Sequence, residues 1–363
     1  MGKNNKKFIN SLKEVFLPKG YPNSVTNDYI EYQIWDSLQA FASSINGALA
    51  TQAVLKGVGV GNENATALAA TITWLIKDGS GMIGRILFTW KKSNDLDRYS
   101  KTWRLMADIL NDVSFFIDII SVWISYYPLF FMLLCISSIL KSIVGVAGGV
   151  TRTVVVQHQA INDNIGDVAA KDGSQETLLN LVSLISSVLL LPLVHENHVL
   201  IWICFIIFTT IHIFSNYKAV RSLKFNIFNQ ETYSIAVKEY LNGNINNLNI
   251  DYINKNEPLF VSNLSKKRYL GYNISTRKKD DDEWYVGDSY KIIIKDGITY
   301  INFYDSSTIE SQFKALFNLE YGTIKAVYSE DIKSYEIFKN ELIKNGWNMN
   351  KNNFGIDKEK KDD

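Results

Sequence analysis

Charged side chains interrupt several otherwise apolar segments of this chain, and they are the residues with the clearest potential for chemistry. Two lysines, two arginines and three aspartates are the candidates: Lys77, Asp78, Arg85, Asp108, Asp112, Lys141 and Arg152. Charges inside a membrane are costly, so we expect them to face the interior of a helix bundle or a water-filled cavity, and to pair. Two interpretations stay open: a polar site for a small solute, and structural ion pairs that hold the bundle together.

The spacing of these charges predicts two specific pairs. Arg85 and Asp108 lie equally far from the middle of the loop between two apolar segments, and Asp112 and Lys141 lie equally far from the next turn. Residues equidistant from a turn between antiparallel helices share a depth. Asp108 and Asp112 are four positions apart, which places them on one helix face. We therefore predict the pairs Arg85–Asp108 and Asp112–Lys141.

Six apolar segments must position these charges. They cover residues 35–56, 65–90, 103–125, 128–157, 177–194 and 199–214. Pro128 separates the third segment from the fourth. The last two segments are apolar around the whole helix, which favours contact with lipid, and they approach the roughly 20 residues needed to cross a bilayer. The expected fold is mainly α: a polytopic six-helix transmembrane bundle, followed by a small cytosolic α/β domain. A soluble helical bundle is the alternative.

Loop charges predict the orientation. With a cytosolic N-terminus, lysines and arginines gather in the cytosolic segments 1–34, 91–102 and 158–174 and beyond residue 218, whereas the opposite loops contain neither. This asymmetry is the positive-inside pattern. We expect an integral, multi-pass protein in the lipid bilayer with both termini cytosolic. The sequence does not indicate the organelle.

Composition divides the chain into four parts: a cytosolic N-terminal segment 1–34, a transmembrane domain 35–217, a cytosolic α/β domain 218–347 and a disordered tail 348–363. In the third part, the β-rich runs Tyr290–Ile294 and Ile298–Tyr304 flank a turn with Gly297, which predicts a β-hairpin. Helices are expected over Ser307–Leu319 and Ile332–Lys344.

Two further patterns concern helix packing. Gly145 and Gly149 have the G-x-x-x-G spacing that lets helices approach closely in lipid. Contact within the chain is the first interpretation and dimerisation the second. The sequence Lys77-Asp78-Gly79-Ser80 recurs as Lys171-Asp172-Gly173-Ser174, so the second and fifth segments would correspond in a repeat of three helices plus three.

Several function classes are not expected. A net charge of +1 lacks the basic excess of a nucleic-acid-binding protein. His195 and His198 lack an evident third metal ligand. No Ser-His-Asp or Cys-His arrangement can be assembled, so the sequence predicts no catalytic residues, no metal site, no cofactor and no enzyme.

Several long motifs resemble the root UVB-sensitive family over about residues 16–194. The motifs are Gly20–Val25, Tyr32–Ala40, Ala50–Gly61, Lys77–Met82 with Gly84-Arg85, Trp103–Leu105 with Asp108 and Asn111-Asp112, Lys141–Gly149 and Ala170–Thr177. The resemblance implies a membrane-associated protein with links to UV-B responses and vitamin B6 homeostasis. No catalytic residues are established for that family.

The segment Asp97-Arg98-Tyr99-Ser100-Lys101 resembles a loop in one half of a major facilitator transporter, although Ser100 and Ser93 stand where glycines are expected. Six spans make only half of such a transporter, so transport would require a homo- or hetero-oligomer with a related chain. The first hypothesis is transport or sensing of a small polar solute such as a B6 vitamer. The alternative is a non-transporting membrane adaptor that acts through its C-terminal domain and a protein partner.

Overall fold

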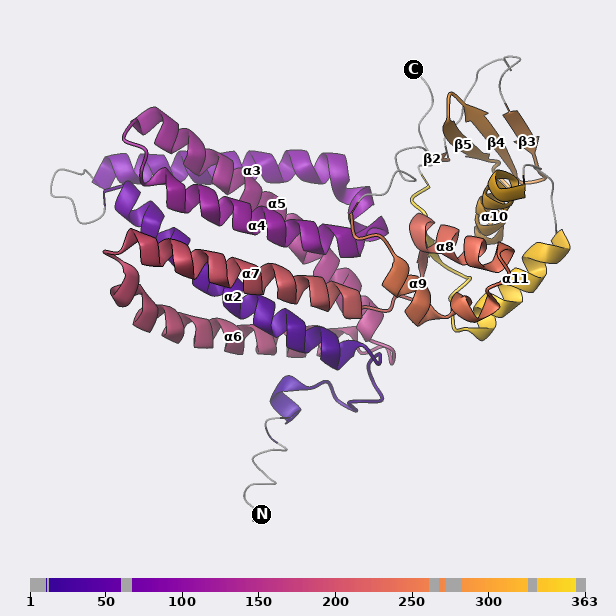
Figure 1. The fold of residues 1–363 in the computed structure, drawn as a ribbon, viewed down its shortest axis with the longest axis horizontal. Coiled ribbons are helices and arrows are strands. Elements are labelled where there is room, and N and C mark those ends of the chain that lie inside the picture. The colour runs from indigo at the N-terminus through magenta and orange to yellow at the C-terminus, as the bar shows by residue number, and fades with distance from the viewer. Residues whose placement is uncertain are drawn as a thin grey trace, which may run out of the picture. The chain divides into compact units, whose positions relative to one another are not determined.

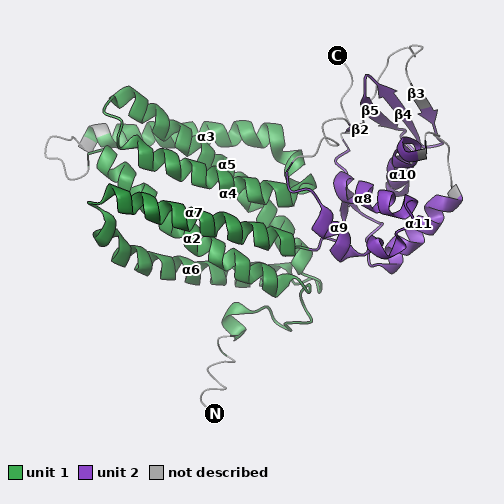
Figure 2. Cartoon of the chain, in the orientation of Figure 1, with its two compact units in different colours: residues 1–223 green, residues 224–363 purple. Residues whose placement is uncertain are grey.

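The computed structural model of the chain describes residue 11 and residues 13–59, 67–260, 268–271, 283–325 and 332–356. The chain divides into two compact units, residues 1–223 and 224–363 (Figure 2). The boundary between them lies at residues 223 and 224, rather than at the predicted 217 and 218.

In the part of unit 1 that the structure describes there are six long helices (Figure 1). Their bounds are Tyr29–Gly57 (α2), Ala67–Arg98 (α3), Ser100–Ser121 (α4), Tyr127–Gln159 (α5), Ile165–Val194 (α6) and His198–Ser222 (α7). Each predicted apolar segment falls on one of these helices. Pro128 lies in the first turn of α5, where its missing N–H costs no helical hydrogen bond.

Three of these helices have the length and composition to cross a membrane. Among the described residues, α5, α6 and α7 each contain a sufficiently apolar window with at most two charged residues. The windows are also poorly covered by protein, since about a fifth or less of each is buried. Such exposed apolar surface is expected where lipid replaces water.

The six helices pack in a pattern that repeats within unit 1. Helix α2 packs against α6 and α7, and α5 packs against α3 and α4, with α3 and α6 at opposite edges (Figure 1). Exchanging α2–α4 with α5–α7 maps these contacts onto one another, although α2 also packs against α4 whereas α5 and α7 have no comparable contact among the described residues. The sequence Lys77–Ser80 lies in α3 and its repeat Lys171–Ser174 lies in α6, the corresponding helix. Because each half has three helices, the two halves run in opposite directions.

The glycines that permit close helix packing within the chain are not the predicted ones. A Cβ at Gly84 of α3 would lie 2.8 Å from Ile139 Cγ2 of α5, and one at Gly81 would lie 2.7 Å from two serine hydroxyls. A Cβ at Gly149 would meet no atom within 4 Å, and one at Gly145 would meet only the end of the Arg85 side chain. Gly145 and Gly149 therefore do not bring helices of this chain together, and contact with a second chain stays a prediction.

This difference predicts the effect of two matched substitutions in α3. Gly79→Ala adds a methyl group to open space and should stabilise the helix by up to about 1 kcal/mol. Gly84→Ala should lose that gain, because overpacking against the stiff Ile139 side chain costs roughly 1–3 kcal/mol. Thermal unfolding of the full chain in one detergent compares the two. Equal melting temperatures would contradict the close contact between α3 and α5.

Unit 2 contains a four-stranded sheet in the order β2-β5-β4-β3. Its strands are Arg268–Leu270 (β2), Glu283–Val286 (β3), Tyr290–Lys295 (β4) and Ile298–Phe303 (β5). Strands β4 and β5 pair antiparallel, and Asp296 and Gly297 between them have φ angles of 51° and 72°. Positive φ at both positions is typical of a type I′ turn, so the predicted hairpin is confirmed.

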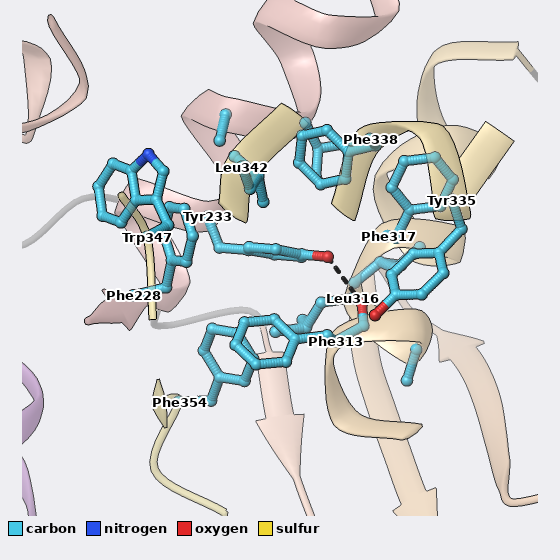
Figure 3. Close-up of a cluster of buried hydrophobic side chains, with 14 of the residues drawn as sticks. Phe228, Tyr233, Phe313, Leu316, Phe317, Tyr335, Phe338, Leu342, Trp347 and Phe354 are labelled. Carbon is cyan, nitrogen blue, oxygen red and sulfur yellow. Dashed lines mark hydrogen bonds between the residues drawn. The ribbon is translucent and has the colours of Figure 1, made fainter. Parts of the chain in front are cut away.

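Helices and two short strands complete unit 2: Phe228–Asn229 (β1), Gln230–Leu241 (α8), the 3-10 helix Ile245–Leu248 (η1), Ile250–Asn256 (α9), Ile309–Lys325 (α10), Ile332–Lys344 (α11) and Asn352–Asn353 (β6). The helices predicted near residues 307–319 and 332–344 correspond to α10 and α11. An aromatic core lies among these elements (Figure 3). At its centre the buried Tyr233 hydroxyl donates to the carbonyl of Phe313 at 3.0 Å.

The prediction of a disordered tail from residue 348 is wrong for its first part. The Asn348 N–H donates to the carbonyl of Asn226, and strand β6 pairs with β1. Phe354 is fully buried in the aromatic core. The polar and charged composition of the tail suggested disorder, but strand β6 and the buried Phe354 anchor it, and Met349 and Ile356 pack against the same core. Residues 357–363 lie outside the described residues.

Candidate functional site: a polar cavity and a buried Asp–His–Asp cluster

The charged residues of α3 do not form a site together with the candidate charges of the other helices. Lys77 pairs with its neighbour Asp78 at 3.4 Å and lies 4.4 Å from the centre of the Trp74 ring. Asp78 has a half-exposed side chain and Arg85 is exposed. The predicted pair Arg85–Asp108 is wrong, because no ion pair joins these two residues among those that the structure describes, and Asp108 lies instead 3.5 Å from His212.

The second predicted pair is also wrong. Lys141 of α5 pairs with Asp118, which is completely buried, and not with Asp112. Asp112 instead accepts from His212 of α7. Equal distance from the turn predicted the wrong partner for both Asp112 and Lys141, because it ignores the direction in which each side chain leaves its helix.

Asp112 and Asp108 form a buried cluster with His212. The imidazole is fully buried, with Nδ1 2.8 Å from Asp112 Oδ2 and Nε2 3.5 Å from Asp108 Oδ2. Asn216 Nδ2 donates to Asp108 Oδ2 at 2.5 Å. Gln39 Nε2 lies 2.6 Å from the same oxygen and 3.0 Å from His212 Nε2. Three helices, α2, α4 and α7, thus contribute to one hydrogen-bonded group.

A polar cavity lies next to this cluster. It has a volume of about 500 Å³ and is lined by residues of α2, α4, α5 and α6, Gln39 among them. Gly145, Gly148 and Gly149 form part of its α5 wall. Because glycines have no side chain, they leave the space that a packed helix contact would otherwise fill.

Two charged groups stand on the cavity walls. Asp36 of α2 pairs with Arg104 of α4. Arg152 of α5 donates from Nε to Asp172 Oδ2 and from Nη1 to Glu176 Oε2 of α6, both at 2.5 Å. The Arg152 side chain is 38% exposed and Glu176 47%, so this second group is open to a ligand.

The N-terminal segment packs against the ends of α5 and α6 near this second group. The cavity residue Gln175 donates to the carbonyl of Phe16 at 2.6 Å and to the Tyr29 hydroxyl at 3.2 Å. Val25 forms a β-bridge with Ala160. Burial raises the pKa of the Tyr29 hydroxyl to about 12, so it stays protonated at neutral pH. The segment preceding α2 therefore helps to build one end of the cavity.

Of the seven candidate charges, only Arg152 lines the cavity, and Asp108 and Asp112 lie behind it through Gln39. The sequence interpretation missed Asp36, Arg104, Asp172 and Glu176, although all four lie within the family-like motifs. It also missed His212, an isolated histidine in an apolar run that carries no pattern of its own. In the part of the chain that the structure describes, no group of three metal-ligating side chains is close enough to hold an ion.

Fold and site together define a mainly helical protein with three helices able to cross a membrane and a charged cavity among its helices. The chain belongs to the root UVB-sensitive family, described as the vitamin B6 photo-protection and homoeostasis domain, whose profile matches residues 2–244. This result confirms the resemblance found in the motifs.

Two relatives show how far the similarity extends. RUS family member 1 of Dictyostelium discoideum is 52% identical over 228 residues, which make up 62% of this chain and 43% of that protein. Protein root UVB sensitive 3 of Arabidopsis thaliana is 39% identical over 229 residues, 63% of this chain and 51% of that protein. The chain thus spans about half the length of these relatives. No solved structure matches it.

Proposed function

We propose that this chain is a multi-pass membrane protein that binds a small zwitterionic solute in the polar cavity, in order to transport or sense it in vitamin B6 homeostasis. The observation that carries the proposal is the cavity itself. Its volume of about 500 Å³ lies within the range of roughly 300–1,000 Å³ that is usual for small-molecule sites. Two of the helices that line it, α5 and α6, are able to cross a membrane.

The cavity charges favour a solute that carries both signs. Arg104 and Arg152 offer cations, and Asp36, Asp172 and Glu176 offer carboxylates. Charged side chains this close to lipid destabilise the protein, and a bound ligand of complementary charge offsets that unfavourable free energy. B6 vitamers combine a pyridine nitrogen, a phenolic oxygen and, in their phosphates, a dianionic group. The family link to vitamin B6 makes them the first solutes to test.

The proposed topology has six spans with both termini cytosolic. The repeated packing of α2–α4 and α5–α7 supports it, because inverted three-helix repeats are common in transporters. Exposed apolar side chains on α3 and α6, such as Met82 and Leu193, need lipid or a second, related chain against them. With six spans the chain has the size of half a transporter, which favours the second chain.

Binding can be tested with pyridoxine 5′-phosphate, which lacks the aldehyde that would react with lysines. Arg152→Gln should weaken binding by roughly 10- to 100-fold, because a charged hydrogen bond contributes about 1.5–3 kcal/mol. Lys92→Gln removes a surface charge outside the cavity and should leave the affinity unchanged. Calorimetry on the full chain in nanodiscs measures both. Absence of binding to the wild type, or equal loss in both variants, would refute the proposal.

A membrane adaptor that acts through unit 2 is the second candidate. Unit 2 has its own aromatic core, and the family match ends at residue 244, within its first elements. A chain ending at Leu223 separates the two functions. If the protein binds the solute, the shortened chain should keep its affinity for the vitamer. If it is an adaptor, the shortened chain should lose its cellular function, and the vitamer should have no effect on the full or the shortened chain.

A further inference from the structure

We infer that the Asp108–His212–Asp112 cluster is a proton-binding site, and that Gln39 couples its protonation to the polar cavity. The inference deepens the proposed function, on which its coupling part rests. It adds a second ligand, the proton, and a residue through which proton and solute affect one another.

Burial and geometry indicate an exchangeable proton. His212 is fully buried between two carboxylates, each of which faces one ring nitrogen. Asp112 is 5% exposed, and its Oδ1 atom has no hydrogen-bond partner in the described part of the chain. The Asn46 amide interacts with the same carboxyl group through a side-chain hydrogen bond. With one carboxylate at each ring nitrogen, the imidazole can carry a proton on Nδ1 alone or on both nitrogens, and the proton on Nε2 is the exchangeable one.

The charged neighbours of His212 come from the helices packed around α7. Helix α4 supplies Asp108 and Asp112, and Arg104 one turn earlier interacts electrostatically with Asp108. Helix α2 supplies the neutral amides of Gln39 and Asn46, with Asp36 paired to Arg104. Interacting sites of this kind take up protons as a unit rather than singly.

The orientation of the Gln39 amide depends on the protonation state of the His212 imidazole. Its amide nitrogen donates to Asp108 Oδ2 at 2.6 Å and lies 3.0 Å from His212 Nε2, a contact that is a hydrogen bond only when Nε2 carries no proton. A protonated Nε2 is itself a donor and cannot accept from this amide. The amide must then turn, so that its carbonyl oxygen faces the ring and its NH₂ group moves away. Asp108 keeps its contact with Asn216 and gains the imidazolium, so its charge stays compensated.

The turn of Gln39 reaches the solute because Gln39 lines the cavity. It replaces a carbonyl oxygen at the cavity wall by an NH₂ donor, which favours an anionic solute group. By linkage, a solute that prefers the NH₂ face must in turn favour protonation of the cluster. Asp112 holds the Nδ1–H in both states and thereby fixes Nε2 as the atom that exchanges its proton.

The first experiment needs no solute. Histidine ¹⁵N spectra of the full chain in nanodiscs contain four histidines, and His212→Gln identifies the signal of His212. We expect this signal to titrate between pH 5 and 10 and its titration curve to change in Gln39→Leu. Substitution of the exposed residue next to Gln39, Leu38→Ala, should leave the titration curve unchanged. A His212 signal that does not titrate in this range, or that ignores Gln39→Leu, overturns the inference.

The second experiment measures the affinity for pyridoxine 5′-phosphate between pH 6 and 9. Titration of the solute itself affects all variants alike, so the readout is the ratio of Kd between His212→Gln and wild type. We expect this ratio to change about tenfold across the range, within the usual size of coupling between two sites. His195→Gln, the same exchange at a half-exposed histidine, should give a constant ratio. A constant ratio for His212→Gln overturns the coupling.

Failure of the two proposals can be distinguished. If no vitamer binds but His212 titrates and responds to Gln39→Leu, the proposed function is wrong and the proton site is supported. If the vitamer binds but His212 does not titrate, the solute site is supported and the proton site is wrong.

Discussion

Lys141→Met is expected to lower the free energy of unfolding by about 3 kcal/mol, because it leaves the Asp118 carboxylate buried without its partner. Asp118 is completely buried, and removal of one partner of a buried pair typically costs about 3–5 kcal/mol. The lower end applies because the Lys141 side chain is 36% exposed and partly solvated already. Chemical unfolding of the full chain in detergent measures the change, with the surface variant Lys92→Met as the control.

Double variants test which carboxylate is the partner. Asp118→Asn combined with Lys141→Met should recover much of the lost stability, because it removes the stranded charge. Asp112→Asn combined with Lys141→Met should recover none, because Asp112 faces His212. Recovery with Asp112→Asn and none with Asp118→Asn would show that the pairing inferred from depth, and not the one in the structure, holds.

Phe354→Ala is expected to destabilise unit 2 by about 3–5 kcal/mol, the usual cost of truncating a buried phenylalanine. The ring is fully buried, and its centre lies 5.0 Å from that of Phe313 and 5.4 Å from that of Tyr233 (Figure 3). Hydrogen exchange on the full chain should become faster throughout residues 283–325, far along the chain from the substitution.

Ile337→Ala provides the control, because Ile337 lies on α11 but is 48% exposed. It should change exchange in unit 2 by much less. If Phe354→Ala changes exchange only within the last ten residues, the tail does not contribute to the core, and the predicted disordered tail would describe the protein better.

Local features of the fold could be predicted because their causes are local. Asp296 and Gly297 are of the residue types that most readily adopt the positive φ of a two-residue hairpin turn, so the hairpin follows from these two residues and the β-rich runs beside them. Pro128 cannot continue a helix from the preceding segment, so the boundary between α4 and α5 follows from one residue. Apolar composition likewise predicted α5, α6 and α7 as helices able to cross a membrane.

The partners of the buried charges could not be predicted in this way. Depth along an antiparallel pair fixes height but not the direction in which a side chain points. Successive helix residues turn by roughly 100°, so Asp112 and Asp118 point roughly 120° apart on α4. Asp118 therefore meets Lys141 of α5, whereas Asp112 meets His212 of α7.

The sequence by itself determined the family, the helices, the hairpin and the presence of costly charges in apolar segments, because each of these depends on residues that are neighbours in the chain. The tertiary structure alone decided which charges meet and where space is left. Gln39 and His212 are 173 residues apart, and only the packing of α2 on α7 brings them into contact. The cavity also depends on the packing of the helices, because its walls come from four helices whose relative rotation no local sequence pattern encodes.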